Sequence, residues 1–186
     1  MVLNNKSETI DKLISCLQNF GANLEIKNPG ESIHPENYCG IVISGGFLPG
    51  NRYRELLVWY CNLLNMVQQP LLGVCLGLRI MGYCYGARIR KMEAEENGVV
   101  TVSFHKEYPL APKRRELKVY ETHLYELIST GRDLENYGSS NLCKIQAVKH
   151  KNKPQFGVQF HPEIDKEKNE GWIILENFVK LCMNKT

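Results

Sequence analysis

The chain of 186 residues has the composition of an ordinary globular domain, with 43% hydrophobic and 23% charged residues. Its length favours one domain, residues 1–186, with a core of its own. The net charge of +3 is too small to indicate nucleic acid as a partner, and the apolar runs fall short of the ~20 residues of a membrane helix. We expect no membrane partner either, and a cytoplasmic location, because no secretion signal is evident.

Seven cysteines are spread along the sequence without a C-x-x-C pair or a zinc-type Cys/His spacing. Their odd number and the lack of a secretion signal argue against a disulfide framework. We therefore expect no metal ion and no cofactor in this chain. Apart from Cys75, whose sequence context is distinctive, the cysteines are expected to be buried thiols in a reducing compartment.

The first half of the chain alternates between apolar runs and segments with helical periodicity. Strands are predicted at 1–4, 23–26, 40–44 and 71–75, and helices over about 10–20, 53–67 and 76–85. The clearest helix carries its apolar residues at helical spacing, at Tyr53, Leu56, Leu57, Tyr60, Leu63, Leu64 and Val67. This alternation is typical of a parallel sheet with helices on both faces.

The second half contains mostly short strands, predicted at 98–104, 117–121, 143–148 and 156–160. Their short connections predict that the sheet gains antiparallel members. A last helix carries its apolar face on Trp172, Ile174, Leu175, Phe178, Val179 and Cys182. The predicted fold is therefore a single α/β domain with an open, mixed and largely parallel sheet flanked by helices.

Cys75 lies between a predicted strand and a predicted helix, in the stretch GVCLGLR. Gly73 and Gly77 complete the G-x-nucleophile-x-G pattern of a nucleophile elbow, in which a strained turn exposes the nucleophile. The start of the helix favours a thiolate, and the N–H of Leu76 can point at an oxyanion. Because G-x-C-x-G alone is a weak pattern, a plain buried thiol remains the alternative at this point.

Two further motifs follow predicted strands, where active sites of open parallel sheets are found. His161 follows the stretch FGVQF and precedes Glu163 by two residues, so an extended chain would point both side chains the same way. This pattern predicts a base oriented by a carboxylate, and the alternative is a surface histidine beside a helix-capping glutamate. In SGG, the N–H of Gly46 can donate to an oxyanion, unless the glycines form only a tight turn.

The stretches ISGG, GVCLG and FGVQFHPE occur in the order and spacing of the class I glutamine amidotransferases, and the chain resembles this family over essentially its whole length. The resemblance implies a flavodoxin-like fold and glutamine as the substrate. It implies that Cys75 attacks the γ-carboxamide, that His161 passes the thiol proton to the departing ammonia, and that Glu163 orients His161. Gly46 and Leu76 would bind the oxyanion.

Within the family, KMEAEENGVVTV, AVKHKNKPQFGVQFHPEI and WIILENFVKLC are most similar to the separate glutaminase subunit of archaeal-type GMP synthetases. That similarity implies a partner, an ATP-pyrophosphatase subunit, which uses ATP and magnesium to aminate XMP to GMP. The alternatives are a subunit for another acceptor, of the anthranilate or aminodeoxychorismate type, a hydrolase of γ-glutamyl compounds, and a glutamine-binding regulatory subunit with weakened turnover.

The sequence departs from the family pattern around the expected substrate site. CLGHQ of the family is CLGLR here, Phe47 replaces a proline after SGG, THLYE replaces an SHKDE-like segment, and LNNKSE stands where a DNGGQ-like stretch is usual. Gly45, Arg79 and His123 are candidate substrate contacts. Arg79 either pairs with the α-carboxylate of the substrate or faces a protein carboxylate or solvent, and the sequence leaves both possibilities open.

Three charged segments are candidates for docking the synthetase. PKRREL and KHKNKP are basic, and EAEE is acidic. The alternative for each segment is a solvated face without a partner.

Overall fold

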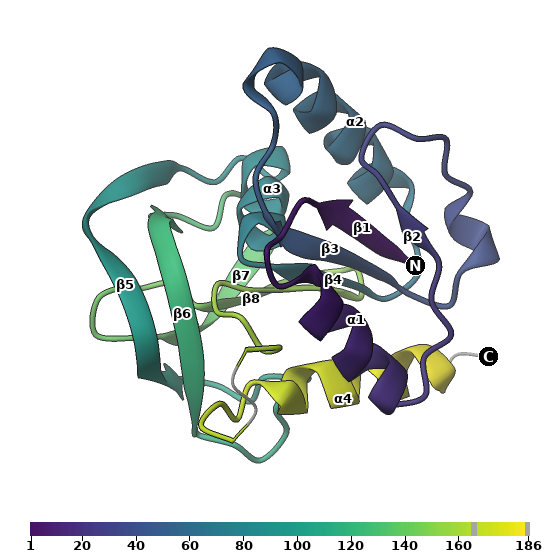
Figure 1. Cartoon of the computed structure of the whole chain (residues 1–186). Coiled ribbons are helices and arrows are strands. Elements are labelled where there is room, and N and C mark those ends of the chain that lie inside the picture. The colour runs from purple at the N-terminus through teal and green to yellow at the C-terminus, as the bar shows by residue number, and fades with distance from the viewer. Residues whose placement is uncertain (165–166, 185–186) are drawn as a thin grey trace.

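The computed structural model describes residues 1–164 and 167–184, which form an α/β fold (Figure 1). The strands are β1 (Val2–Asn5), β2 (Ile26–Lys27), β3 (Ile41–Gly46), β4 (Leu71–Val74), β5 (Ile89–Phe104), β6 (Glu116–Leu127), β7 (Leu134–Ser139), β8 (Ala147–His150) and β9 (Gln155–Val158). The α-helices are α1 (Ile10–Asn19), α2 (Tyr53–Met66), α3 (Leu76–Cys84) and α4 (Trp172–Met183). Within the described residues, none of these helices has the length and apolarity of a membrane span.

All the strands belong to a single sheet with a parallel half and an antiparallel half. The strand order over the described residues is β2-β1-β3-β4-β9-β8-β7-β5-β6. Pairing is parallel from β2 to β9 and antiparallel from β9 to β6. The carboxyl ends of β1, β3, β4 and β9 therefore lie along the same edge of the sheet, where open α/β sheets bind their ligands. This topology confirms the predicted fold class.

Helices cover both faces of the parallel half, and each face has its own hydrophobic core. α1 and α4 lie along one face, and α2 and α3 cover the other (Figure 1). Val2 and Val42 belong to the first core, whereas their neighbours Leu3 and Ile43 belong to the second. Because side chains alternate between faces along a strand and both faces are buried, these strands have uninterrupted apolar sequences.

The strand predictions were wrong at four places. β2 covers only Ile26–Lys27, since only these two residues pair with β1. β6 continues to Leu127, beyond the predicted 117–121, so THLYE lies inside a strand. β8 begins at Ala147 rather than at residue 143, because the preceding residues form a turn in which the N–H of Ser140 donates to the Cys143 carbonyl. β7 was not predicted, since Asn and Gly have low strand propensity.

The cysteines also differ from the expectation. Cys61 of α2 and Cys84 of α3 form a disulfide with Cα atoms 5.0 Å apart, and Cys39 is exposed. The prediction of buried thiols is therefore wrong for these three residues, because the packing of α3 against α2 aligns two cysteines that linear spacing does not connect. The other cysteines are buried, as expected: Cys16, Cys75, Cys143 and Cys182.

Candidate active site

Cys75 occupies the turn between β4 and α3 in a conformation that non-glycine residues rarely adopt, with φ of 50° and ψ of −100°. The flanking glycines permit this turn. A Cβ on Gly73 would lie 2.6 Å from the backbone of Gly77, and a Cβ on Gly77 would collide with the carbonyl oxygen of Ile43. The N–H of Cys75 donates to the carbonyl of Val158 at 2.8 Å, which ties the turn to β9. The turn has the strained geometry that the elbow pattern predicts.

His161 and Glu163 form a buried hydrogen-bonded pair. Nδ1 of His161 lies 2.8 Å from Oε1 of Glu163, and the hydroxyl of Thr9 donates to the same oxygen at 2.6 Å. The reason expected for this pairing was wrong, because Pro162 and Glu163 lie in a turn rather than in an extended segment. The N–H of Ile164 donates to the carbonyl of His161 at 3.3 Å. It is this turn that brings the carboxylate back to the imidazole.

The electrostatics of the site favour a thiolate–imidazolium pair. Burial alone would raise the pKa of the Cys75 thiol, but a hydrogen bond to His161 and the charges of His161 and Arg79 hold the pKa below its ordinary value. Burial opposes the charged form of His161, yet its bonds to Cys75 and Glu163 raise the pKa to about 10. Both directions leave the proton on His161 at neutral pH. Nε2 of Gln159 lies 3.6 Å from the sulfur as a further donor.

Gly45 and Gly46, at the end of β3, bring the backbone against the catalytic pair. A Cβ on Gly45 would lie 2.9 Å from Cε1 of His161 and 3.6 Å from Cβ of Cys75, so a side chain at this position would push against the imidazole. Gly46 has a φ of +110°, which favours glycine. Leu76 begins α3, where the first N–H groups have no partner within the helix. The oxyanion donors Gly46 and Leu76 and a substrate contact at Gly45 stay predictions.

A cavity of about 320 Å³ opens onto Cys75 and His161. Its walls come from the segment after β1, the end of β3, the start of α3 and the β5–β6 pair, and they include Lys6, Ser7, Glu8, Thr9, Gly46, Phe47, Arg79, Glu95, Thr122, His123, Leu124 and Tyr125. Charged side chains of both signs face this space. A cavity with mixed charge is complementary to a zwitterion, such as a free amino acid.

Arg79 points toward the catalytic thiol rather than toward a protein carboxylate. Its Nη2 lies 3.8 Å from Sγ of Cys75, and its guanidinium carbon lies 5.7 Å from the ring centroid of Tyr125. Nε of Arg79 is buried and has no hydrogen-bond partner among the described residues. This geometry favours the first of the two alternatives, a guanidinium that retains donors for a substrate carboxylate.

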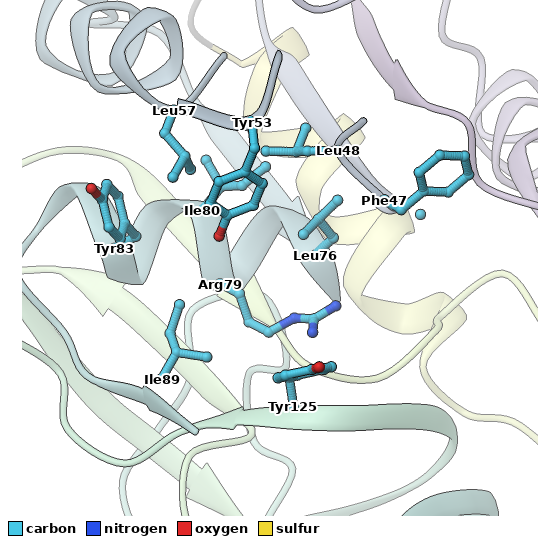
Figure 2. A pocket seen from close by; sticks show the side chains of 11 residues that line it. Phe47, Leu48, Tyr53, Leu57, Leu76, Arg79, Ile80, Tyr83, Ile89 and Tyr125 are labelled. Carbon is cyan, nitrogen blue, oxygen red and sulfur yellow. The ribbon is translucent and has the colours of Figure 1, made fainter. Parts of the chain in front are cut away.

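A second cavity, of about 420 Å³, lies beside the first and is mostly apolar (Figure 2). Its side chains come from the β3–α2 loop, α2, α3, β5 and β6, and they are Phe47, Leu48, Tyr53, Leu57, Leu76, Arg79, Ile80, Tyr83, Ile89 and Tyr125. Arg79 and Tyr125 also line the catalytic cavity. Phe47, which replaces the proline of the family pattern, is 55% exposed at this aromatic wall.

Two of the three charged segments contact the protein itself. Nζ of Lys153, in KHKNKP, donates to the carbonyls of Leu64 and Asn65 at the end of α2, at 3.0 Å each. In EAEE, Glu96 is only 3% exposed. EAEE is therefore not a continuous acidic surface, and KHKNKP stabilises the end of a helix. Docking by PKRREL stays a prediction.

Sequence reasoning missed three side chains that hold the catalytic residues in place. Thr9 binds Glu163, Gln159 donates to Cys75, and Nδ2 of Asn169 donates to the carbonyl of His161 at 2.7 Å. Gln159 lies inside FGVQFHPE, so the motif itself was a signal that went unused. Thr9 precedes its partner by 154 positions, and no local pattern marks it.

The chain matches known proteins over nearly its full length. The family model named Glutamine amidotransferase class-I matches residues 1–181. A subunit of the glutamine-hydrolyzing GMP synthase of Methanocaldococcus jannaschii is 30% identical over 187 residues, which cover 98% of this chain and 96% of that protein. The protein of the same name from Pyrococcus abyssi is 29% identical and covers 98% and 97%.

A solved structure from Thermoplasma acidophilum, provisionally assigned as the same GMP synthase subunit, superposes with a TM-score of 0.87. Its sequence is 25% identical to this one, and the match covers 99% of this chain and 93% of that one. The chain belongs to the class-I glutamine amidotransferase family.

Proposed function

We propose that this chain is the glutaminase subunit of a two-subunit GMP synthetase. It hydrolyses glutamine to glutamate and ammonia, and a separate ATP-pyrophosphatase subunit uses the ammonia, with ATP and magnesium, to aminate XMP to GMP. The observation that carries the hydrolytic part is the thiolate–imidazolium pair of Cys75 and His161 at the cavity. The acceptor rests on the similarity to subunits of glutamine-hydrolyzing GMP synthases. The cytoplasmic location stays a prediction.

In the proposed reaction, the Cys75 thiolate attacks the γ-carboxamide carbon, and the N–H groups of Gly46 and Leu76 stabilise the oxyanion that forms. His161 donates its proton to the leaving nitrogen, so that ammonia departs and a thioester remains. His161 then takes a proton from water, which attacks the thioester and releases glutamate. Glu163 keeps the imidazole oriented and stabilises its charged form throughout.

The cavity walls supply partners for the zwitterionic end of glutamine. Arg79 is positioned to bind the α-carboxylate, because its guanidinium borders the cavity and its Nε lacks a partner among the described residues. Glu8 and Glu95 line the same cavity and offer carboxylates for the α-ammonium group. This assignment gives the departure from the family pattern at position 79 a role in binding the substrate.

The test is glutamate production from glutamine, by the chain alone and with an archaeal-type XMP-aminating synthetase plus ATP, magnesium and XMP. We expect the synthetase to increase glutamate production and GMP to appear. Cys75→Ala should abolish both, whereas Cys39→Ala, a change at an exposed cysteine, should leave them intact. Hydrolysis that the synthetase does not change would contradict the GMP assignment, and the absence of hydrolysis in both conditions would contradict the glutaminase itself.

A further inference from the structure

The inward face of β6 changes from apolar to ionisable along the strand. Leu117 and Val119 are buried in the core, and the next two inward positions are Glu121 and His123, which are 0% and 4% exposed. A register shift in β5 places Glu96 directly opposite His123. Three ionisable side chains therefore meet in a buried cluster. Such a cluster is costly unless its members compensate one another.

Both imidazole nitrogens of His123 face oxygen acceptors. Nε2 lies 3.0 Å from Oε2 of Glu96 and 3.2 Å from Oε2 of Glu121, and Nδ1 lies 3.2 Å from the carbonyl oxygen of Tyr125. Since acceptors cannot donate, each ring nitrogen carries a hydrogen, as in an imidazolium. Burial alone would lower the pKa of His123, but the bonds to the two carboxylates raise it to about 9.

The carboxylate of Glu96 is fixed by further donors. The hydroxyl of Ser140 donates to Oε1 at 2.7 Å, and Nε2 of Gln146 donates to Oε2 at 3.0 Å. With His123, three donors converge on Glu96, whereas burial raises the pKa of Glu121 and neither of its oxygens has a hydrogen-bond donor among the described residues. Glu96 is therefore the principal counter-charge of the imidazolium.

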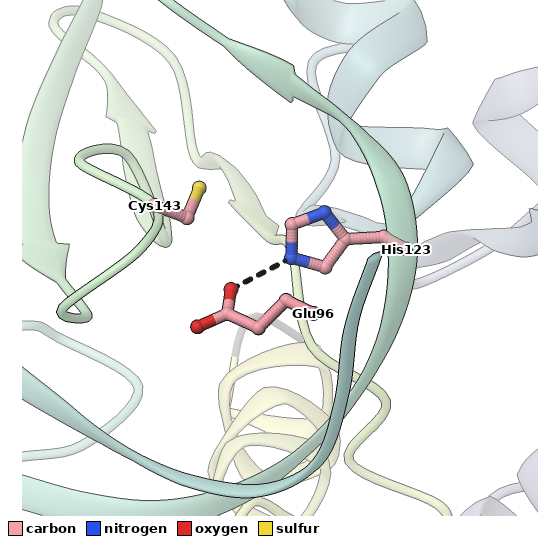
Figure 3. Close-up of side chains that lie close together, drawn as sticks. All are labelled: Glu96, His123 and Cys143. Carbon is pink, nitrogen blue, oxygen red and sulfur yellow. Dashed lines mark hydrogen bonds and ion pairs between the residues drawn. The ribbon is translucent and has the colours of Figure 1, made fainter. Parts of the chain in front are cut away.

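The cluster has the chemistry of a hydrogen-bonded charge array rather than of a metal centre. Ligand-type atoms of Glu96, His123 and Cys143 lie within 4.8 Å of one another (Figure 3). The histidine, however, uses both nitrogens as donors and offers no lone pair to a metal ion. Burial raises the pKa of the Cys143 thiol, which donates to the carbonyl of Ile145 at 3.5 Å. A protonated thiol is a poor metal ligand.

The array borders the catalytic cavity. His123 lines the same cavity as Cys75, and its charge is one of those that lower the pKa of the Cys75 thiol. The titratable groups around His123 are Glu96 from β5, Glu121 from β6, Cys143 before β8 and Cys75 from the β4–α3 turn. No atom of the imidazole that donates or accepts is left for a substrate, so its role differs from the contact expected from sequence.

We propose that His123 is a positioning residue, a buried cation that Glu96 holds doubly protonated and that stabilises the Cys75 thiolate before glutamine enters. This role rests on the proposed function, in which that thiolate is the nucleophile. His161 and Arg79 are the other two cations that act on the sulfur. His161 must release its proton during turnover, whereas His123 keeps its charge through the cycle.

The test is the rate of Cys75 alkylation by iodoacetamide as a function of pH, followed by peptide mass spectrometry on the full chain. His123→Gln should move the midpoint upward by about one pH unit and slow alkylation below the midpoint about tenfold. Glu96→Gln should act in the same direction, because the imidazole then loses its counter-charge. His34→Gln, at an exposed histidine paired with Glu36, should match the wild type.

Imidazole ¹⁵N shifts provide a readout that does not depend on the thiol. At pH 7.5 both ring nitrogens of His123 should be protonated in the wild type, and one should lose its proton in Glu96→Gln. An unprotonated nitrogen in the wild type would overturn the role, as would an unchanged alkylation midpoint in both folded variants. A wild-type midpoint near that of an ordinary cysteine, about 8.5, together with no glutamine hydrolysis, would instead overturn the proposed function as well.

Discussion

The parallel and antiparallel halves of the sheet build the catalytic cavity by different means. The parallel half presents Cys75 and His161 just beyond the ends of the adjacent strands β4 and β9, in turns shaped by glycine and proline. The antiparallel half contributes Glu96 and His123 from within paired strands, through the register of β5 on β6. A group that attacks the substrate has to stand clear of a strand end, whereas a charge that only acts on that group can remain buried inside the sheet.

Proton transfer belongs to the parallel half, so the largest effect is expected there. His161→Asn removes the group that carries the proton to the departing ammonia, and glutamine turnover should fall about 10³-fold or more. The measurement is kcat for glutamate release. His105→Asn, at an exposed histidine of the antiparallel half bonded to the carbonyl of Asn136, should retain wild-type kcat. A loss of less than tenfold in His161→Asn would place the acid elsewhere.

The disulfide between α2 and α3 braces the helices over one face of the parallel half. Its 23-residue separation predicts a loss of about 3 kcal/mol of unfolding free energy in Cys84→Ser, or roughly 6–12 °C in Tm for a chain of this size. Thermal unfolding measures the change, with Cys39→Ser as the matched control. Reductant should lower the Tm of the wild type to that of the variant. A Tm that is insensitive to both changes would show that the crosslink contributes nothing.

Arg79 brings a third charge to the thiol, from α3 rather than from either set of strands. The guanidinium favours the thiolate and so lowers the pKa of Cys75, and Arg79→Gln should therefore raise it. Alkylation of Cys75 below its midpoint should slow about fivefold, and KM for glutamine should rise if the α-carboxylate is bound here. Arg54→Gln, at an exposed arginine of α2, is the matched control. An unchanged midpoint with an unchanged KM would assign Arg79 neither role.

The smallest effect is expected for the support behind Glu163. Thr9→Val removes one hydrogen bond to this carboxylate while the bond from His161 remains, so kcat should fall only several-fold, as for the loss of ~1 kcal/mol. Thr9→Ser keeps the hydroxyl and should restore most of the activity. If both variants behave alike, the methyl group of Thr9 matters and its hydrogen bond does not.

The same division explains how much could be predicted from sequence. The strands β3, β4 and β9 and all four helices follow from apolar runs and helical periodicity, because local pattern determines which faces are buried. Cys75, His161 and Glu163 lie in contiguous motifs. The extension of β6, β7 as a strand, and the buried cluster could not be predicted, because Glu121 and His123 interrupt the apolar alternation and only pairing with β5 compensates them. Thr9 reaches its partner through tertiary contact alone.

The central claim is that Cys75 is an activated thiolate in a site shaped for glutamine. The most direct test treats the full chain with an equimolar diazoketone analogue of glutamine and measures the intact mass and the modified peptide. The account predicts one adduct, on Cys75, that excess glutamine prevents and that Cys75→Ala abolishes, while the exposed Cys39 remains unmodified. The absence of an adduct, or modification of Cys39 as fast as Cys75 and without protection by glutamine, would contradict it.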